Sequence, residues 1–388
     1  MVLNNYPADY SSLNGDLIYT VYDSTKVSDP VTYVGYQYVC DVYVGGTQIA
    51  RLKAAPNPVN GRGIFNIGRA VRNYLAFQFN PTASAFKVQE FGDTEFRLSV
   101  QCKFGEDYGG TTYTNIITDS SRKFYNHYNG RLTSADTILP SYLDKLGTNA
   151  PATRYVGYGK RCFMPYVSTT TGTVAVIATA YNAAGSSTGS YTGTLSVTAY
   201  NISIVDIGGL GINALAGSSL ITASTAYYTV SINGYVTTVY VYCEPKFTPY
   251  SIHFLNKLGG FESFDFRKLS RKTLEFEKKT YQQQSYRIDS SGVSSIRTSG
   301  NVMYDADTVY AVNYSEKMKL YADITTDAQY QWLSELVLSP VVYFDDSSYL
   351  VPVTITDTSY EFKKYINDKI TSLMINIDFG KKLNTQFR

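Results

Sequence analysis

Apolar and polar residues alternate with a period of two along the early part of the chain. Between Phe96 and Phe104, apolar residues occupy every second position and polar residues lie between them. This period is typical of a β-strand with one buried face. A similar alternation from Tyr38 to Val44 reaches Gly45-Gly46 and continues from Thr47 to Leu52, which predicts a hairpin.

Helical spacing occurs in three short places. Apolar residues between Ile67 and Leu75 predict a short helix that covers a sheet. A second short helix is expected from Ser141 to Leu146, directly after Pro140. The third prediction is a helix over 327–338, because Thr326 and Gln329 have the spacing of a capping box and an apolar stripe begins at Trp332.

Changes in composition divide the chain into four predicted parts. Residues 1–105 are expected to form a β-sandwich, and residues 106–165, where periodicity is weak, a loop-rich connecting region. Residues 166–245 are rich in Ser, Thr, Gly and Tyr and predict a second β-sandwich, ending in a strand from Val236 to Cys243. Residues 246–388 are more charged and predict a β domain with the helix 327–338. The fold class is therefore mainly β: two immunoglobulin-like sandwich modules followed by an antiparallel barrel or sandwich with one covering helix.

Composition favours contacts with other proteins. The 37 Tyr residues suit interfaces, because a Tyr ring offers apolar area and a hydroxyl that water or a partner can satisfy. Strand propensity alone is the alternative explanation. The formal net charge of +2 disfavours nucleic-acid binding by phosphate neutralisation. We expect no secretion signal at the amino terminus and no membrane insertion, since Asp206 and several glycines interrupt the least polar run, Ser203 to Ala223.

Residues that could carry chemistry do not form a recognisable catalytic pattern. The only histidines, His127 and His253, lack Ser, Cys or metal-ligand partners at motif spacing. Asp345-Asp346 is interpreted as a hairpin turn. We therefore predict no catalytic residue, no metal and no cofactor. Paired carboxylates leave a glycan hydrolase as a minor alternative. The candidate pairs are Glu106 with Asp107, Glu262 with Asp265, and Asp345 with Asp346.

The four cysteines are expected to be buried thiols. Cys40 and Cys102 both fall on inward strand positions, and their separation is similar to that of an immunoglobulin disulfide. The tryptophan that accompanies such a pair is missing, because the only tryptophan is Trp332. Whether Cys40 and Cys102 are bonded stays open at this point.

Several segments resemble virion structural proteins of tailed phages that infect Bacteroidetes, including crAss-like phages. The strongest is Tyr250 to Phe266, which has the pattern of a strand, a Gly-Gly turn and an aromatic-rich strand. The other segments are Tyr38 to Thr47, Arg51 to Lys53, Gly63 to Ile67, Tyr330 to Pro340 and Val351 to Asp357. The resemblance implies a non-enzymatic virion component, similar to a distal tail, baseplate or head-tail accessory protein, that is assembled in the host cytoplasm.

The functional hypothesis is a repeated structural subunit that forms a tail, collar or baseplate ring with other virion proteins and with copies of itself. Unpaired strand edges and aromatic anchors would provide the contacts. The candidate interface residues are Tyr33, Tyr36, Tyr38, Tyr240, Tyr242, Phe261, Phe264 and Phe266. The alternative from another class is a head fibre, capsid decoration or receptor-binding module that recognises a host surface glycan.

Overall fold

A computed structural model describes residues 1–82, 85–127, 139–242, 246–282, 284–303, 307–324, 326–357, 371–380 and 383–384. The protein is mainly β, with 53% of residues in strands and 9% in helices, and most strand pairs are antiparallel. The chain divides into two compact units. The first comprises Met1–Glu244, His253–Asp265 and Gln331–Pro340, and the second comprises Pro245–Ile252, Phe266–Tyr330 and Val341–Arg388.

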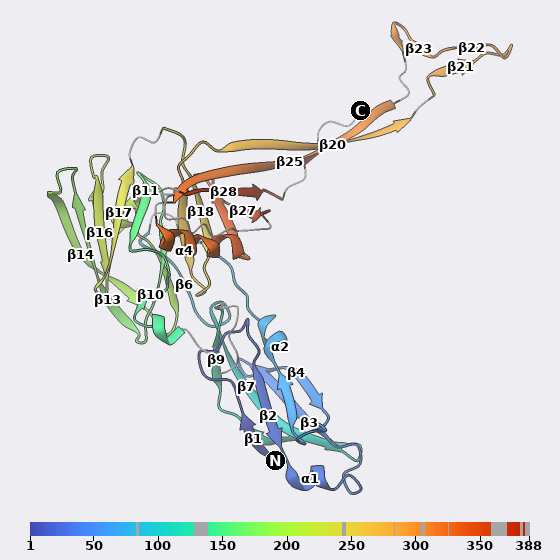
Figure 1. The fold of residues 1–388 in the computed structure, drawn as a ribbon, viewed down its shortest axis with the longest axis vertical. Coiled ribbons are helices and arrows are strands. Elements are labelled where there is room, and N and C mark those ends of the chain that lie inside the picture. Colours follow the sequence, from blue (N-terminus) through green and yellow to red (C-terminus); the bar gives the residue numbers. More distant parts are fainter. Residues whose placement is uncertain are drawn as a thin grey trace. The chain divides into compact units, whose positions relative to one another are not determined.

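Two sheets share the amino-terminal core of the first unit (Figure 1). The larger has the order β4-β3-β7-β8, with β9 also paired to β7, and the smaller has the order β1-β2-β5. Buried side chains from both sheets meet between them, among them Tyr19, Tyr38 and Phe104. The elements are β1 (Val2–Asn5), β2 (Ile18–Tyr22), α1 (Ser24–Ser28), β3 (Gln37–Val44), β4 (Thr47–Ala54), β5 (Gly63–Asn66), α2 (Gly68–Arg72), β7 (Arg97–Tyr108), β8 (Thr111–Thr118) and β9 (Arg122–Tyr125).

A second core in the first unit also lies between two sheets. One sheet has the order β10-β12-β15-β6, and the other β11-β17-β16-β13-β14, in which only the β11–β17 pair is parallel. Helix α3 contributes Ile212 to this core. The elements are β6 (Lys87–Phe91), β10 (Lys145–Leu146), β11 (Thr153–Gly157), β12 (Phe163–Val167), β13 (Gly172–Tyr181), β14 (Ser187–Val197), β15 (Ile202–Asp206), α3 (Gly209–Ala216), β16 (Tyr227–Ile232) and β17 (Tyr235–Tyr242).

The strands β18 (Tyr250–Leu255) and β19 (Phe261–Phe266) are neighbours joined by a turn at Gly259-Gly260. Gly259 has a φ of +87°, and a Cβ there would lie 2.2 Å from the carbonyl oxygen of Asn126. Only glycine therefore fits this turn. Helix α4 (Asp327–Leu338) places Trp332 against Phe254 and Phe264 of the two strands, with ring centroids 5.8 and 5.9 Å away.

The second unit contains an antiparallel ladder in the order β26-β27-β28-β25-β20. Its strands are β20 (Arg271–Gln282), β25 (Asp307–Ile324), β26 (Val342–Asp345), β27 (Leu350–Ile355) and β28 (Thr371–Asp378). Four short strands form two hairpins between β20 and β25, and one further short strand pairs with β25. These are β21 (Tyr286–Ile288), β22 (Ser294–Ile296), β23 (Thr298–Ser299), β24 (Val302–Met303) and β29 (Leu383–Asn384).

Several predicted elements are confirmed. The Gly45-Gly46 hairpin joins β3 to β4, and α4 covers 327–338, with the Thr326 hydroxyl accepting a hydrogen bond from the Gln329 amide at 3.2 Å. Asp346 accepts hydrogen bonds from the amides of Ser348 and Tyr349 in the turn between β26 and β27. The predicted mainly β fold with antiparallel sheets is confirmed, whereas the two immunoglobulin-like sandwich modules and the barrel stay predictions.

The region 106–165 differs most from its prediction. It was expected to be a loop-rich connection with a helix from Ser141 to Leu146, but a 3-10 turn covers Leu139–Tyr142 and β10 follows at Lys145–Leu146. The region also supplies β8, β9 and β11, and most of β12. Strand β6, from the expected first sandwich, pairs with β15, from the expected second. Cross-strand partners that are distant in sequence thus override weak local periodicity. The expected final strand is β17, and Cys243 lies outside the described residues.

Candidate interaction arm

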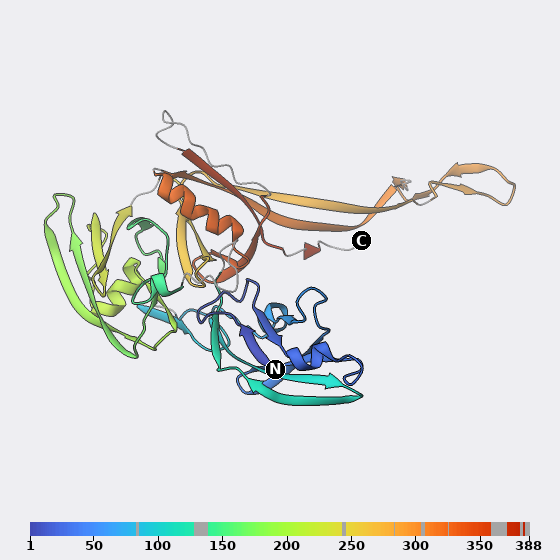
Figure 2. The same cartoon turned by 60° about the horizontal axis from the view of Figure 1, so that its bottom comes forward.

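The second unit has a long two-stranded ribbon formed by β20 and β25 (Figures 1 and 2). The base of β25, Lys317–Ile324, also pairs with β28, and Asn313 and Tyr314 pair with β29. Beyond Asn313, no other described strand pairs with the ribbon. We call residues 274–282 and 307–316 the arm. Beyond Asn313 the arm is therefore a two-stranded element, and such an element is only marginally stable in water by itself.

Every residue of β20 is exposed. Leu274 and Phe276 alternate on one face of the arm and are 54% and 68% exposed. Their cross-strand partners are Glu316 and Tyr314. This face therefore presents large apolar side chains to solvent along a strand that has one unpaired edge, which is the arrangement of a surface that binds other chains.

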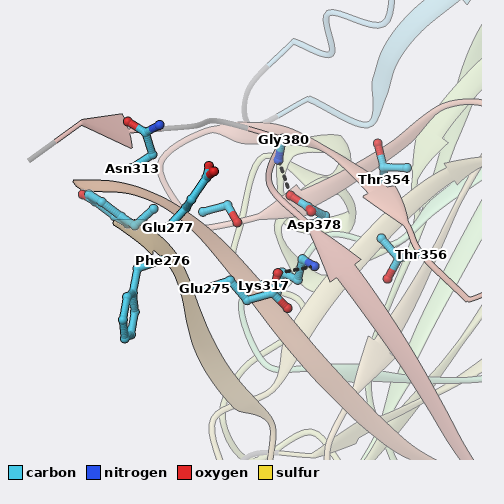
Figure 3. A pocket seen from close by; sticks show the side chains of 11 residues that line it. Glu275, Phe276, Glu277, Asn313, Lys317, Thr354, Thr356, Asp378 and Gly380 are labelled. Atoms are coloured by element: carbon cyan, nitrogen blue, oxygen red, sulfur yellow. Dashed lines mark hydrogen bonds and ion pairs between the residues drawn. The ribbon is translucent and has the colours of Figure 1, made fainter. Parts of the chain in front are cut away.

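The opposite face of the arm is polar. Lys317 Nζ donates a hydrogen bond to the Glu275 carboxylate at 2.6 Å and forms an ion pair with it. This hydrogen bond is the main cause of the raised pKa of Lys317. Glu277 lies opposite Asn313. Figure 3 shows the side chains of Glu277 and Phe276 directed to opposite sides of the strand. Between Leu274 and Glu277, apolar side chains of β20 therefore lie on one face of the arm and carboxylates on the other, with a period of two.

An open groove of about 550 Å³ lies along the polar face. Glu275, Glu277 and Asp378 contribute carboxylates to its lining, and Lys317 contributes the only cation among its lining residues (Figure 3). Asp378 also accepts a hydrogen bond from the Gly380 amide at 2.7 Å. In the part of the chain that the structure describes, no group of His, Cys, Asp and Glu side chains has an arrangement that could hold a metal ion.

The segment between the two arm strands carries further exposed apolar residues. Asp289 closes its first hairpin by accepting hydrogen bonds from the amides of Ser291 and Val293, both at 2.9 Å. Five apolar side chains described in this segment are each at least half exposed, and they are Tyr286, Ile288, Val293, Ile296 and Met303. The apolar character of the arm thus continues toward this end of the ribbon.

The predicted interface residues do not form one surface. Tyr36, Tyr38, Phe261 and Phe266 are buried. The Tyr36 hydroxyl donates to Glu106 at 2.9 Å, and the Tyr38 hydroxyl donates to the Gly61 carbonyl at 2.9 Å. Phe261 stacks on Phe79 with centroids 3.8 Å apart. These four rings fill the interior of their own chain and are not free to contact a partner.

The other four candidates are more accessible and belong to the first unit, whereas the arm belongs to the second. Tyr33 packs edge-on against Tyr108 at 5.0 Å, and Phe264 packs against Trp332. The Tyr242 hydroxyl donates to Asp265. Tyr240 is 42% exposed on β17. Sequence reasoning did not select Leu274 and Phe276 as contacts.

Polar groups considered for catalysis are engaged in structural contacts within the first unit. Glu262 pairs with Arg154 at 3.3 Å and accepts a hydrogen bond from Trp332 Nε1 at 2.5 Å. His253 Nδ1 lies 2.7 Å from the Ser263 hydroxyl. Glu335 accepts a hydrogen bond from Asn149 at 3.0 Å, and burial, followed by the nearby charge of Glu262, raises the pKa of Glu335. These contacts connect α4 to β11, β18 and β19.

The cysteines described are free. Cys40, Cys102 and Cys162 are buried thiols, so the possible bond between Cys40 and Cys102 is absent. Burial raises the pKa of Cys162 to about 12, which keeps this thiol protonated and unreactive.

No helix in the described ranges is long and apolar enough to cross a membrane. No protein-family model and no curated protein sequence matches the chain.

Proposed function

We propose that the protein is a non-enzymatic structural subunit that assembles with other chains through its arm. The observation that carries this proposal is the full exposure of β20, with Leu274 and Phe276 on one face of a strand whose outer edge is unpaired in the described chain. Burying each of these side chains against a partner would contribute about 1.5–3 kcal/mol. A partner would also complete the unpaired edge of β20.

The resemblance to phage virion proteins gives this assembly its proposed setting: a tail, collar or baseplate ring built from copies of this chain and other virion proteins. We further propose that the two layered cores of the first unit are immunoglobulin-like sandwich modules and that the ladder of the second unit belongs to a barrel or sandwich. The subunit would be assembled in the host cytoplasm and would require no cofactor.

Recognition of a host glycan has less support. Tyr155, Tyr240, Tyr227 and Tyr181 form a row across four strands, with successive ring centroids 5.5, 5.5 and 4.7 Å apart. Rings at these separations with small interplanar angles cover one another's faces. Sugar rings usually pack on open aromatic faces, and this row offers few.

The test is the double substitution Leu274→Ser and Phe276→Ser. Sedimentation velocity and electron microscopy of the full chain should show that the native protein forms a closed oligomer and that the variant assembles at least about tenfold more weakly, because the apolar face is lost. The matched control is Glu277→Ser with Lys279→Ser, which changes the polar face of the same strand and keeps the net charge. A native chain that stays monomeric, or a control as defective as the apolar variant, would refute the proposal.

A further inference from the structure

Strand β14 is an unusually open sheet edge within the first unit (Figure 1). It has eleven residues, Ser187–Val197, and it is the last strand of the order β11-β17-β16-β13-β14. No described strand pairs with its outer side. It contains neither a charged residue nor a proline, and the only register shift in its pairing lies at Ala180/Tyr181, beside the hairpin turn. The usual protections of an edge strand are therefore missing over most of its length.

Other edge strands in the first unit are short or protected, since β1, β5, β10 and β11 have at most five residues each. Strand β4 carries Arg51 and Lys53, and β6 carries Lys87 and Glu90. Strand β8 is uncharged, but its ladder has a register shift and Asn115 has a φ of +57°. Bulges and charges of this kind prevent another chain from pairing with an edge. The contrast singles out β14.

The carboxy-terminal end of β14 is contacted by side chains of β6. Lys87 Nζ donates to the Ser196 carbonyl at 2.8 Å, and Glu90 accepts a hydrogen bond from the Thr198 amide at 2.8 Å. These contacts protect the strand from Ser196 onwards. The open edge is thus limited to nine residues, Ser187 to Leu195, and we call this segment the free edge.

The sheet face that meets the free edge carries no charge. The only charged residue in these five strands is Arg154, which is 5% exposed. A row of hydroxyl side chains crosses the sheet in register. Its members are Thr153, Thr238, Thr229, Thr179 and Ser190. Thr179 and Ser190 are 3.1 Å apart at their hydroxyl oxygens. The row ends at Ser190 on the free edge, because no described strand follows β14 in this sheet.

We propose that the free edge pairs with the free edge of a second copy of this chain, antiparallel and about a two-fold axis. In the register centred on Tyr191, Gly189 faces Gly193 of the partner subunit, and Ser190 faces Thr192 of the partner subunit. Hydroxyl pairs across strands are favourable, so the row continues into the second copy. No like charges oppose each other, and the two five-stranded sheets become one.

A second copy fits better than a partner of different composition. Two-fold contacts require a surface that is complementary to itself, and the free edge is nearly symmetric in residue size about Tyr191: Thr-Gly-Ser precedes it and Thr-Gly-Thr follows it. The contact lies on β14 and does not involve the arm, so it joins copies independently of the proposed arm contacts.

The test uses the full chain in the Leu274→Ser/Phe276→Ser background, which removes the apolar contacts of the arm. Sedimentation equilibrium from about 1 to about 100 µM should show a monomer–dimer equilibrium. Adding Ser190→Lys and Thr192→Lys should weaken the dimer at least about tenfold, because each Lys would face a Lys of the partner subunit. Hydrogen exchange at Ser187 to Leu195 should slow on dimerisation only without these two substitutions.

The matched control is Ile177→Lys with Thr179→Lys, since these residues on β13 lie directly opposite Thr192 and Ser190. The control places the same charges on the same face, one strand away from the edge, and should still dimerise. A chain that stays monomeric throughout, a control that is equally weakened, or protection of the free edge only when a different protein is added would each overturn the proposal. A dimer that forms through the free edge while the arm variant shows no assembly defect would leave this inference standing and remove the proposed function.

Discussion

One buried ion pair of the first unit joins side chains that are far apart in sequence. Arg154 on β11, Glu262 on β19 and Trp332 on α4 meet in one cluster, in which the Arg154 guanidinium also lies 4.4 Å from the Trp332 ring centroid. Both charged side chains are at most 5% exposed. Each charge is therefore tolerated only because the other is present.

Replacing Glu262 with Gln should destabilise the protein by about 3–5 kcal/mol, because Arg154 would stay buried without its counter-charge. Urea unfolding followed by fluorescence of the single tryptophan, Trp332, measures this loss. The control is Glu277→Gln, an exposed carboxylate of the arm, for which a change below about 0.5 kcal/mol is expected. Equal stabilities of the Glu262 variant and the native chain would rule out a role for this ion pair.

His127 should make the amino-terminal core sensitive to acid. Burial lowers the pKa of His127 and outweighs the opposite effect of the Tyr10 carbonyl, which lies 3.0 Å from Nε2, so the folded state favours the neutral ring. The stabilisation is complete above the unfolded-state pKa of about 6.5 and is lost as the pH falls below it toward the lower folded-state pKa. One such group changes stability by at most about 1.4 kcal/mol per pH unit.

Urea unfolding between about pH 7.5 and 5.5, a window around the unfolded-state pKa of His, checks this behaviour. The native protein should lose stability as the pH falls, and His127→Gln should have a shallower dependence. Parallel pH profiles for the two proteins would show that another group controls the acid response.

At the scale of elements, the two strands of the arm differ in support along their length. Residues 317–319 of β25 have a strand on each side and residues 320–324 pair with β28, whereas Lys278–Gln282 pairs only with the end of β25. Amide hydrogen exchange in the free chain should therefore be much faster at Lys278–Gln282 than at 317–324, because local opening there breaks fewer contacts. Equal exchange rates in the two segments would contradict this expectation and would mean that contacts outside the two-stranded ribbon stabilise Lys278–Gln282.

The sequence predicted the positions of strands better than it predicted whether their apolar faces are buried. The alternation in β7 correctly predicted inward Leu98, Val100 and Cys102, because a packed sheet leaves one face buried. The alternation at Leu274 and Phe276 has the same period, yet both side chains are exposed. Alternation shows that the two faces of a strand differ in polarity, but it does not show whether other elements pack on the apolar face. The dense charges of the segment Glu275 to Lys279 were the available signal that neither face enters a core.

Pairing between distant segments could not be read from the sequence. β6 pairs with β15 across more than a hundred residues, and β11 pairs in parallel with β17. Such partners are chosen by packing against the whole sheet, not by local pattern. The cluster of Arg154, Glu262 and Trp332 was missed for the same reason, whereas the Asp345-Asp346 turn was found because its hydrogen bonds are local.

At the scale of the whole molecule, neither compact unit is a continuous stretch of chain. His253–Asp265 and Gln331–Pro340 belong to the first unit, although they follow Glu244 in sequence. Phe261 in the first of these segments stacks on Phe79, so the core of the first unit needs residues from beyond the boundary expected near 245. The arm, in contrast, lies wholly within one segment of the second unit, Phe266–Tyr330, and its exposed apolar face carries the proposed role in assembly.

Photo-crosslinking from the arm tests that connection most directly. With Phe276 replaced by photoreactive benzoylphenylalanine, irradiation of the assembled protein should join position 276 to a different polypeptide chain, identified by mass spectrometry. The same replacement at Glu277, on the polar face, should give far fewer intermolecular products. Crosslinks from position 276 that are confined to its own chain, or the lack of any crosslink, in particles that are nevertheless fully assembled, would contradict an assembly role for the arm.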